Sequence, residues 1–99
     1  MAKVRTHPHD AANYVENAED AVLLLEAALE DGDPRVVAEA IGAIARSKGM
    51  AEVAEATGLS RESLYRALSA NGNPTLSTTL EVLRALNLRL TVARDNAAA

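Results

Sequence analysis

The sequence predicts a single all-α domain of about five helices, with one short β-strand at its C-terminal end. Apolar residues make up 48% of the 99 residues, but Phe and Trp are absent and only two Tyr occur. The core must therefore be built from Ala, Leu, Val and Ile, which suits closely packed helices, and a chain of this length forms one modest core. Apolar residues recur at helical spacing as far as Asn87, where the spacing changes to the two-residue period of a strand.

The first nine residues show no apolar periodicity, and we expect residues 1–9 to form a flexible arm. His7 and His9 lie on this arm with Asp10 as the obvious neighbouring ligand, which is too small a set for a metal site. No apolar stretch follows the first basic residues, so the sequence predicts no signal peptide.

Residues 10–48 are expected to form the N-terminal helices. Asp10 can cap a short helical turn through Tyr14, and Asn17 is the expected N-cap of a longer helix that Gly32 ends. The residues predicted for the buried face of this longer helix are Ala21, Val22, Leu25, Ala28 and Leu29.

A second long helix is expected to start at Pro34, with Asp33 as its N-cap, and to end at Gly49. The residues predicted to be buried on it are Val37, Ile41 and Ile44, with Ala40 and Ala45 on the flanks. Gly42 lies in the middle of this helix, where glycine costs about 1 kcal/mol relative to alanine. We interpret Gly42 as a site of close packing against a neighbouring helix.

Three shorter helices are predicted after Gly49, the first two within residues 50–69 and the third within residues 75–87. Their expected bounds are Met50–Thr57, Arg61–Ser69 and Leu76–Leu86, with Ser60 and Thr75 as the N-caps of the last two. A turn at residues 71–74, with the sequence NGNP, separates the second from the third.

Alternating residues predict one strand at residues 88–93, with Leu88, Leu90 and Val92 on its apolar side. Because the backbone donors and acceptors of a strand need partners, this strand must pair with the N-terminal arm around Val4 or with the same strand of a second chain. We prefer the second chain, which makes the strand the dimer element. Residues 94–99 are expected to be a disordered tail.

Residues 50–69 have the pattern of a helix-turn-helix. Two helices that cross steeply need a small residue at their contact and a turn residue that can adopt a left-handed conformation, and Ala54 and Gly58 meet these needs. Leu59 then fills the turn, Ser60 caps the second helix, and Leu64 packs that helix against the first.

The outward face of the second helix would present side chains to base edges in the major groove of DNA. The residues predicted to read bases are Ser60, Arg61, Glu62, Tyr65 and Arg66. Arginine suits guanine, and glutamate can accept a hydrogen bond from cytosine. The residues predicted to contact phosphates are Ser69, Asn71, Asn73 and Thr75. The alternatives are a solvated helix face for the first set and an ordinary capped turn for the second.

Charge is distributed unevenly along the chain, whose net charge is −4. Residues 1–45 hold three basic and nine acidic residues, whereas residues 46–99 hold seven basic and five acidic residues. The helix-turn-helix half is mildly basic, and the acidic half suggests a second surface with a different partner. Leu23 and Leu24 widen the apolar stripe of the acidic helix, which can meet a basic partner; the alternative is that they complete the core or a dimer contact.

Several classes of function are excluded by residues that the sequence lacks. Cys is absent, which excludes disulfides, thiol catalysis and Cys-based zinc sites. No histidine is placed to activate a serine, and no glycine-rich phosphate loop occurs, so we expect neither an enzyme nor a cofactor. The longest apolar run, residues 21–25, is far too short for a membrane span, so a cytoplasmic protein is expected.

The stretch GMAEVAEATGLSRESLYRALS, residues 49–69, resembles the Xre/Cro class of helix-turn-helix domains. More narrowly, GLSRESLYRALS, GNPTLSTTLEVLRALNLRLTV and the upstream segments DAANYV, LLLEAALEDGDP and IGAIARSKGM are similar to addiction-module antidote proteins. These are HigA-like antitoxins encoded beside small RelE/ParE-type toxins. The resemblance covers residues 10–92, and one departure is Ala51, which stands where many helix-turn-helix repressors have a polar, phosphate-binding side chain.

The resemblance implies a cytoplasmic antitoxin that binds its toxin and represses their shared operon, with DNA contacts at residues 60–62, 65 and 66. We expect this function; the alternatives are a stand-alone Xre-family transcriptional repressor and an interaction module that no longer touches DNA. Because one recognition helix reads few base pairs, we also expect a homodimer on a double-stranded DNA operator, with half-sites about 34 Å apart.

Overall fold

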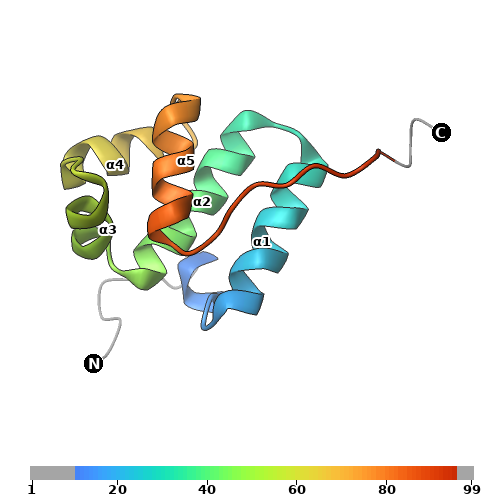
Figure 1. Ribbon diagram of the computed structural model, residues 1–99, viewed down its shortest axis with the longest axis horizontal. Coiled ribbons are helices and arrows are strands. Elements are labelled where there is room, and N and C mark those ends of the chain that lie inside the picture. The colour runs from blue at the N-terminus through green and yellow to red at the C-terminus, as the bar shows by residue number, and fades with distance from the viewer. Residues whose placement is uncertain (1–10, 96–99) are drawn as a thin grey trace.

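The computed structural model describes residues 11–95, which form five α-helices after one 3₁₀ turn (Figure 1). The elements are η1 (Ala11–Tyr14), α1 (Ala18–Asp31), α2 (Pro34–Lys48), α3 (Met50–Thr57), α4 (Arg61–Ala67) and α5 (Leu76–Ala85). The predicted all-α fold of five helices is confirmed. The predictions for the arm at residues 1–9, its two histidines and the end of the tail lie outside the described residues.

Local capping sets the ends of the two long helices as predicted. The side chain of Asn17 accepts a 2.9 Å hydrogen bond from the backbone N–H of Asp20, and Gly32 ends α1 with φ of 83°. At the start of α2, the carboxylate of Asp33 accepts a hydrogen bond from the backbone N–H of Arg35 at 2.9 Å and pairs with its guanidinium at 3.0 Å. The side-chain hydrogen bond from Arg35, with help from the backbone one, holds the pKa of Asp33 below its usual value.

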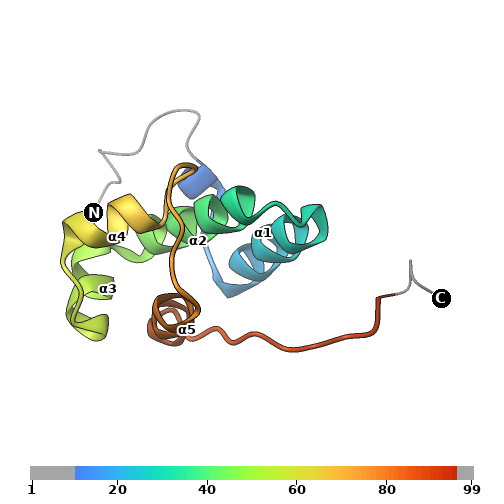
Figure 2. The ribbon, with the colours of Figure 1, turned by 90° about the horizontal axis from the view of Figure 1, so that it is seen from above.

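Helix α2 lies at the centre of the molecule, with α1 on one side and α3 and α4 on the other (Figures 1 and 2). Helix α5 packs against α3. The largest fully buried side chains come from four of these helices and the residue that ends α4: Ile41, Val53, Leu64, Leu68, Val82 and Leu83. The core therefore holds the α3–α4 pair against α2 and α5.

The buried face predicted for α1 is correct for Ala21, Leu25 and Ala28, but wrong for Val22 and Leu29. Val22 is 40% exposed and Leu29 is 48% exposed, because α1 packs on α2 along one narrow stripe. Leu24, on the other flank, is partly buried against the core, whereas Leu23 is 65% exposed. Only one of the two leucines thus contributes to the core, and α1 keeps an apolar strip on its surface.

Gly42 lies where α2 meets the end of α4. A Cβ atom at this position would come within 2.2 Å of the carbonyl oxygen of Leu68 and 3.2 Å of its Cβ. The interpretation of Gly42 as a close-packing site is therefore confirmed, and no larger residue fits without moving the backbone of the neighbouring segment.

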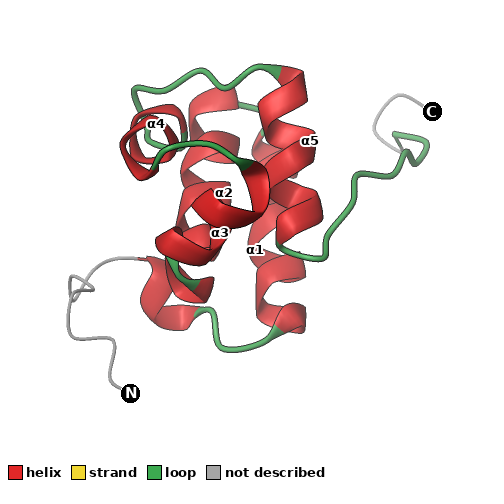
Figure 3. Ribbon diagram, turned by 60° about the vertical axis from the view of Figure 1, so that its left-hand side comes forward, coloured by secondary structure: helices red, strands yellow, loops and turns green. Residues whose placement is uncertain are grey.

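The strand predicted at residues 88–93 is not formed among the described residues, which contain only helices, turns and irregular segments (Figure 3). Asn87 reverses the chain after α5 with φ of 62°, and the N–H of Leu88 donates to the carbonyl of Leu83 at 2.8 Å. Beyond Leu88 the chain is irregular and runs alongside α1. The alternation of apolar residues with a period of two shows which side chains lie on the same side of the segment. A strand also needs the backbone of a partner segment, and no described segment supplies one.

Candidate nucleic-acid interface

The turn between α3 and α4 has the geometry that its sequence predicts. Gly58 adopts φ of 77° and its N–H donates to the carbonyl of Ala54 at 2.9 Å, which closes α3. The hydroxyl of Thr57 adds to this turn, because it donates to the carbonyl of Val53 at 2.8 Å and accepts from the N–H of Leu59 at 3.3 Å. Sequence analysis missed this role of Thr57, although a threonine just before a helix-ending glycine is a recognisable signal for it.

Apolar packing fixes how α4 lies on α3. Leu64 and Val53 are fully buried, and Leu59 and Ala54 are partly buried against the same cluster. Leu64 is the one fully buried residue of the seven in α4; Ser63 and Ala67 are half-buried, and the other four residues are exposed. Leu68, just past the end of α4, is also buried and anchors the chain there.

Ser60 caps α4. Its hydroxyl oxygen accepts a hydrogen bond from the N–H of Ser63 at 3.0 Å and donates to the hydroxyl of Ser63 at 2.9 Å. The Ser60 side chain therefore has a structural role within the chain, and its contact with a base stays a prediction.

The other four side chains predicted to read bases lie together on the exposed surface of α4. They are Arg61, Glu62, Tyr65 and Arg66, and the ring-bearing Tyr65 is 45% exposed. Neither guanidinium, of Arg61 or of Arg66, makes a hydrogen bond or an ion pair within residues 11–95. We call these four residues the α4 face; both of its arginines are free to bind an external acceptor.

The side chains predicted to contact phosphates lie on the connection from α4 to α5. Asn71 and Asn73 are exposed, and their amides have no hydrogen-bond partner in the described part of the chain. Thr75 is exposed but caps α5 by accepting from the N–H of Thr78 at 3.0 Å, and the half-buried Ser69 donates to the carbonyl of Arg66 at 3.0 Å. The two asparagines are thus the freer pair of these four residues.

Glycine sets the path of this connection. A Cβ atom on Gly72 would lie 2.1 Å from the carbonyl oxygen of Ala67 and 2.4 Å from that of Arg66. The chain therefore folds back directly onto the end of α4, which explains why α4 ends at Ala67 rather than at the predicted Ser69. Helix α5 likewise ends one residue early, at Ala85.

The helix-turn-helix itself carries less positive charge than the composition of residues 46–99 suggests. Residues 50–75 carry two arginines against three glutamates, Glu52, Glu55 and Glu62. The nearest further cations in the sequence are Arg46 and Lys48, in the last turn of α2 directly before α3. Ala51 is exposed in the first turn of α3, and its side chain offers no hydrogen-bonding group there. The helix-turn-helix unit therefore presents few cations on its surface.

Residues 11–95 hold no group of three or more His, Cys, Asp or Glu side chains that could bind a metal ion. None of their helices is long and apolar enough to cross a membrane.

Comparison with known proteins gives one family. The family model described as "Probable addiction module antidote protein" matches residues 5–94. A protein of Haemophilus influenzae (strain ATCC 51907 / DSM 11121 / KW20 / Rd), described as an uncharacterized protein, is 38% identical over 86 residues, which cover 87% of this chain and 89% of that protein. No solved structure matches the chain. The description of the family as antidote proteins implies a toxin as the partner. It describes proteins that counteract a toxin rather than proteins that catalyse a reaction. Because the match extends over most of its length, the chain belongs to the family of probable addiction module antidote proteins.

Proposed function

We propose that this protein is the antitoxin of a type II toxin-antitoxin module, which represses its own operon by sequence-specific binding to double-stranded DNA and neutralises a RelE/ParE-type toxin. The observation that carries the DNA-binding part is the α4 face, whose polar side chains project from a helix held by the Gly58 turn. Membership of the antidote family supports the toxin-binding part.

The dimensions of α4 suit the major groove. An α-helix with its side chains is about 10–12 Å across, and the major groove of B-DNA is about 12 Å wide, so α4 can enter the groove. With Leu64 turned inward, Arg61 and Arg66 would bind guanines and Glu62 would accept from a cytosine amino group. Tyr65 would contact a phosphate or a thymine methyl group. We propose these four as the base-reading set, with Ser60 beside them at the helix start.

Phosphate contacts would come from the α4–α5 connection, where Asn71 and Asn73 have free amides. Neutral donors position a protein on DNA without releasing many counterions. The affinity for the operator should therefore weaken with salt, but with a shallow slope that reflects the few cations of the unit.

The working form is proposed to be a homodimer that pairs through the segment after α5. From Arg89 to Ala93 the backbone forms no hydrogen bond with other backbone groups of residues 11–95. Leu90 is 42% exposed and Val92 is 99% exposed, although both lie on the apolar side of the alternating pattern. Pairing of two such segments about a two-fold axis would satisfy their backbone groups and create the strand that one chain alone does not form.

Replacing Leu90 with proline tests this dimer, because proline removes a backbone donor and disfavours a strand interior. We expect light scattering to show a dimer for the wild-type protein and a monomer for L90P. Arg94→Pro, just beyond the predicted strand, is the matched control and should leave the dimer intact. A dimeric L90P protein would show that the segment is not the dimer element.

The proposed function is tested by co-expressing the chain with the adjacent reading frame. We expect the two proteins to purify together and to shift the promoter DNA of their operon, with weaker binding as salt is raised. A stand-alone repressor would shift the DNA but bind no partner. An interaction module that had lost its DNA contacts would leave the promoter unshifted even at low salt.

A further inference from the structure

We propose that the exposed side of α1 is the surface on which this protein binds its toxin, and that the toxin meets it with basic residues around an apolar side chain. The inference rests on the proposed function and adds the location and chemistry of the second binding site. The residues of this surface, called the α1 face below, are Glu19, Val22, Leu23, Glu26, Leu29 and Glu30.

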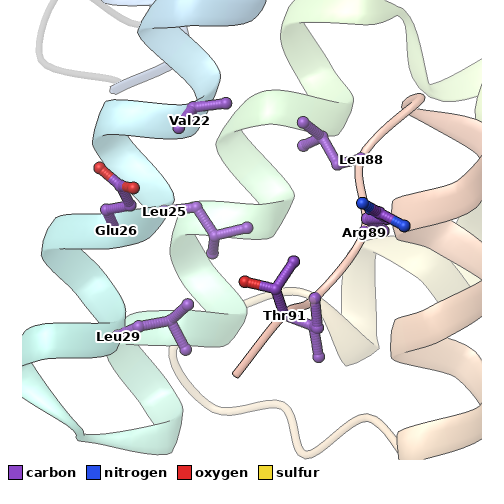
Figure 4. A pocket seen from close by; sticks show the side chains of 8 residues that line it. Val22, Leu25, Glu26, Leu29, Leu88, Arg89 and Thr91 are labelled. Carbon is purple, nitrogen blue, oxygen red and sulfur yellow. The ribbon is translucent and has the colours of Figure 1, made fainter. Parts of the chain in front are cut away.

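The α1 face exposes several large apolar side chains, which is unusual for the solvent-facing side of a helix. Val22, Leu23 and Leu29 are 40%, 65% and 48% exposed. Val22 and Leu29 are exposed to this extent although the apolar periodicity of α1 predicts them on its buried face. Val22 borders two depressions. One is a groove of about 250 Å³ between α1 and residues 88–91 (Figure 4), and the other is a shallow hollow that also involves Ala18 and Leu23. Partner side chains seated in the two depressions would cover Val22 from two sides and remove it from water, which is how residues at a binding hot spot are buried.

The same face is strongly acidic. Residues 16–33 include seven Asp or Glu and no Lys or Arg. Glu19, Glu26 and Glu30 are exposed, and none of them pairs with a basic residue in the part of the chain that the structure describes. A row of unpaired carboxylates along an apolar strip attracts a basic partner, accelerates its association and disfavours acidic ones.

A second copy of this chain is a poorer occupant than a basic protein. In a two-fold contact the same patch lies on both sides, so α1 against α1 would set carboxylates against carboxylates. The like charges would oppose the burial of Val22 and Leu29. The acidity of the face therefore favours a different protein over self-association at this place.

The position of α1 allows both activities of an antitoxin at once. Helix α1 and helix α4 lie on opposite sides of α2, and α1 and α4 are not in extensive contact with each other (Figures 1 and 2). A toxin seated on the α1 face would leave Arg61 and Arg66 uncovered. The complex could then occupy the operator without a change in the antitoxin fold.

The inference is tested by reversing charge on the α1 face of the full chain. The double variant Glu26→Lys/Glu30→Lys should weaken binding of the toxin from the adjacent reading frame at least about tenfold, measured by calorimetry. The matched control Glu39→Lys/Glu81→Lys makes the same charge change at exposed positions of α2 and α5, and its affinity should stay within about twofold of wild type. Both variants should shift promoter DNA as wild type does.

Each other outcome overturns the inference in a distinguishable way. Unchanged toxin binding by the α1 variant would place the toxin site elsewhere and leave the proposed function standing. A change in the mass of the toxin-free protein, measured by light scattering, would show that a second copy covers the α1 face. Failure of the wild-type protein to bind the toxin would overturn the inference together with the toxin part of the proposed function.

Discussion

Replacing Arg61 and Arg66 together with alanine is expected to remove the preference of the protein for its operator over unrelated DNA. Each arginine is exposed on α4 and free of internal partners, and a bidentate contact to guanine contributes about 1–3 kcal/mol of discrimination. The measurement is a competition binding assay that compares operator DNA with a scrambled duplex. Because neither side chain supports the core, the thermal midpoint of the variant should stay close to that of wild type.

A control for general loss of charge is Arg35→Ala/Arg84→Ala, which removes two exposed arginines from α2 and α5. This control should lower affinity for both duplexes slightly and leave their ratio unchanged. If the Arg61/Arg66 variant kept the operator preference of the wild type, α4 would not be the recognition helix, and the proposed DNA-binding mode would have to be abandoned.

Replacing Gly42 with alanine is expected to destabilise the protein, although alanine is the better helix former. The added Cβ would lie 2.2 Å from the backbone oxygen of Leu68, which cannot rotate away as a side chain can. Overpacking of this kind costs about 1–3 kcal/mol, whereas the gain in helix propensity is about 1 kcal/mol, so the free energy of unfolding should fall by up to about 2 kcal/mol. Urea denaturation measures the change.

Ala27→Gly provides the reciprocal control, since Ala27 is exposed in the interior of α1. There glycine should lower the free energy of unfolding by about 1 kcal/mol, the ordinary helix preference. Glycine would then be the better residue at position 42 and the worse one at position 27. A G42A protein more stable than wild type would mean that the end of α4 moves away from α2 at little energetic expense.

Features that depend on neighbouring residues could be predicted from the sequence. Asn17, Ser60 and Thr75 cap helices through their own backbone neighbourhood, and Gly58 turns the chain because its own φ is positive. Such signals need no knowledge of the rest of the fold. They fixed the order of the helices and the outward direction of the α4 face.

Features that depend on distant segments were harder to predict. The period of Leu88, Leu90 and Val92 cannot supply the partner that would make the segment a strand. The period of α1 gives the direction of its apolar side, but how far that side is covered depends on α2, so Val22 and Leu29 were wrongly assigned to the core. The mildly basic charge of residues 46–99 likewise did not predict how few cations the helix-turn-helix itself carries.

Within the α3–α4 unit, the residues that determine its shape and the residues that face solvent are separate sets. Thr57, Gly58, Leu59 and Leu64 make the turn and the packing, whereas Arg61, Glu62, Tyr65 and Arg66 contribute almost nothing to either. Evolution can therefore exchange the outer set without disturbing the scaffold. Under the proposed function, relatives that keep the same framework would diverge toward new operators one surface substitution at a time, which would insulate neighbouring modules in one genome from repressing each other.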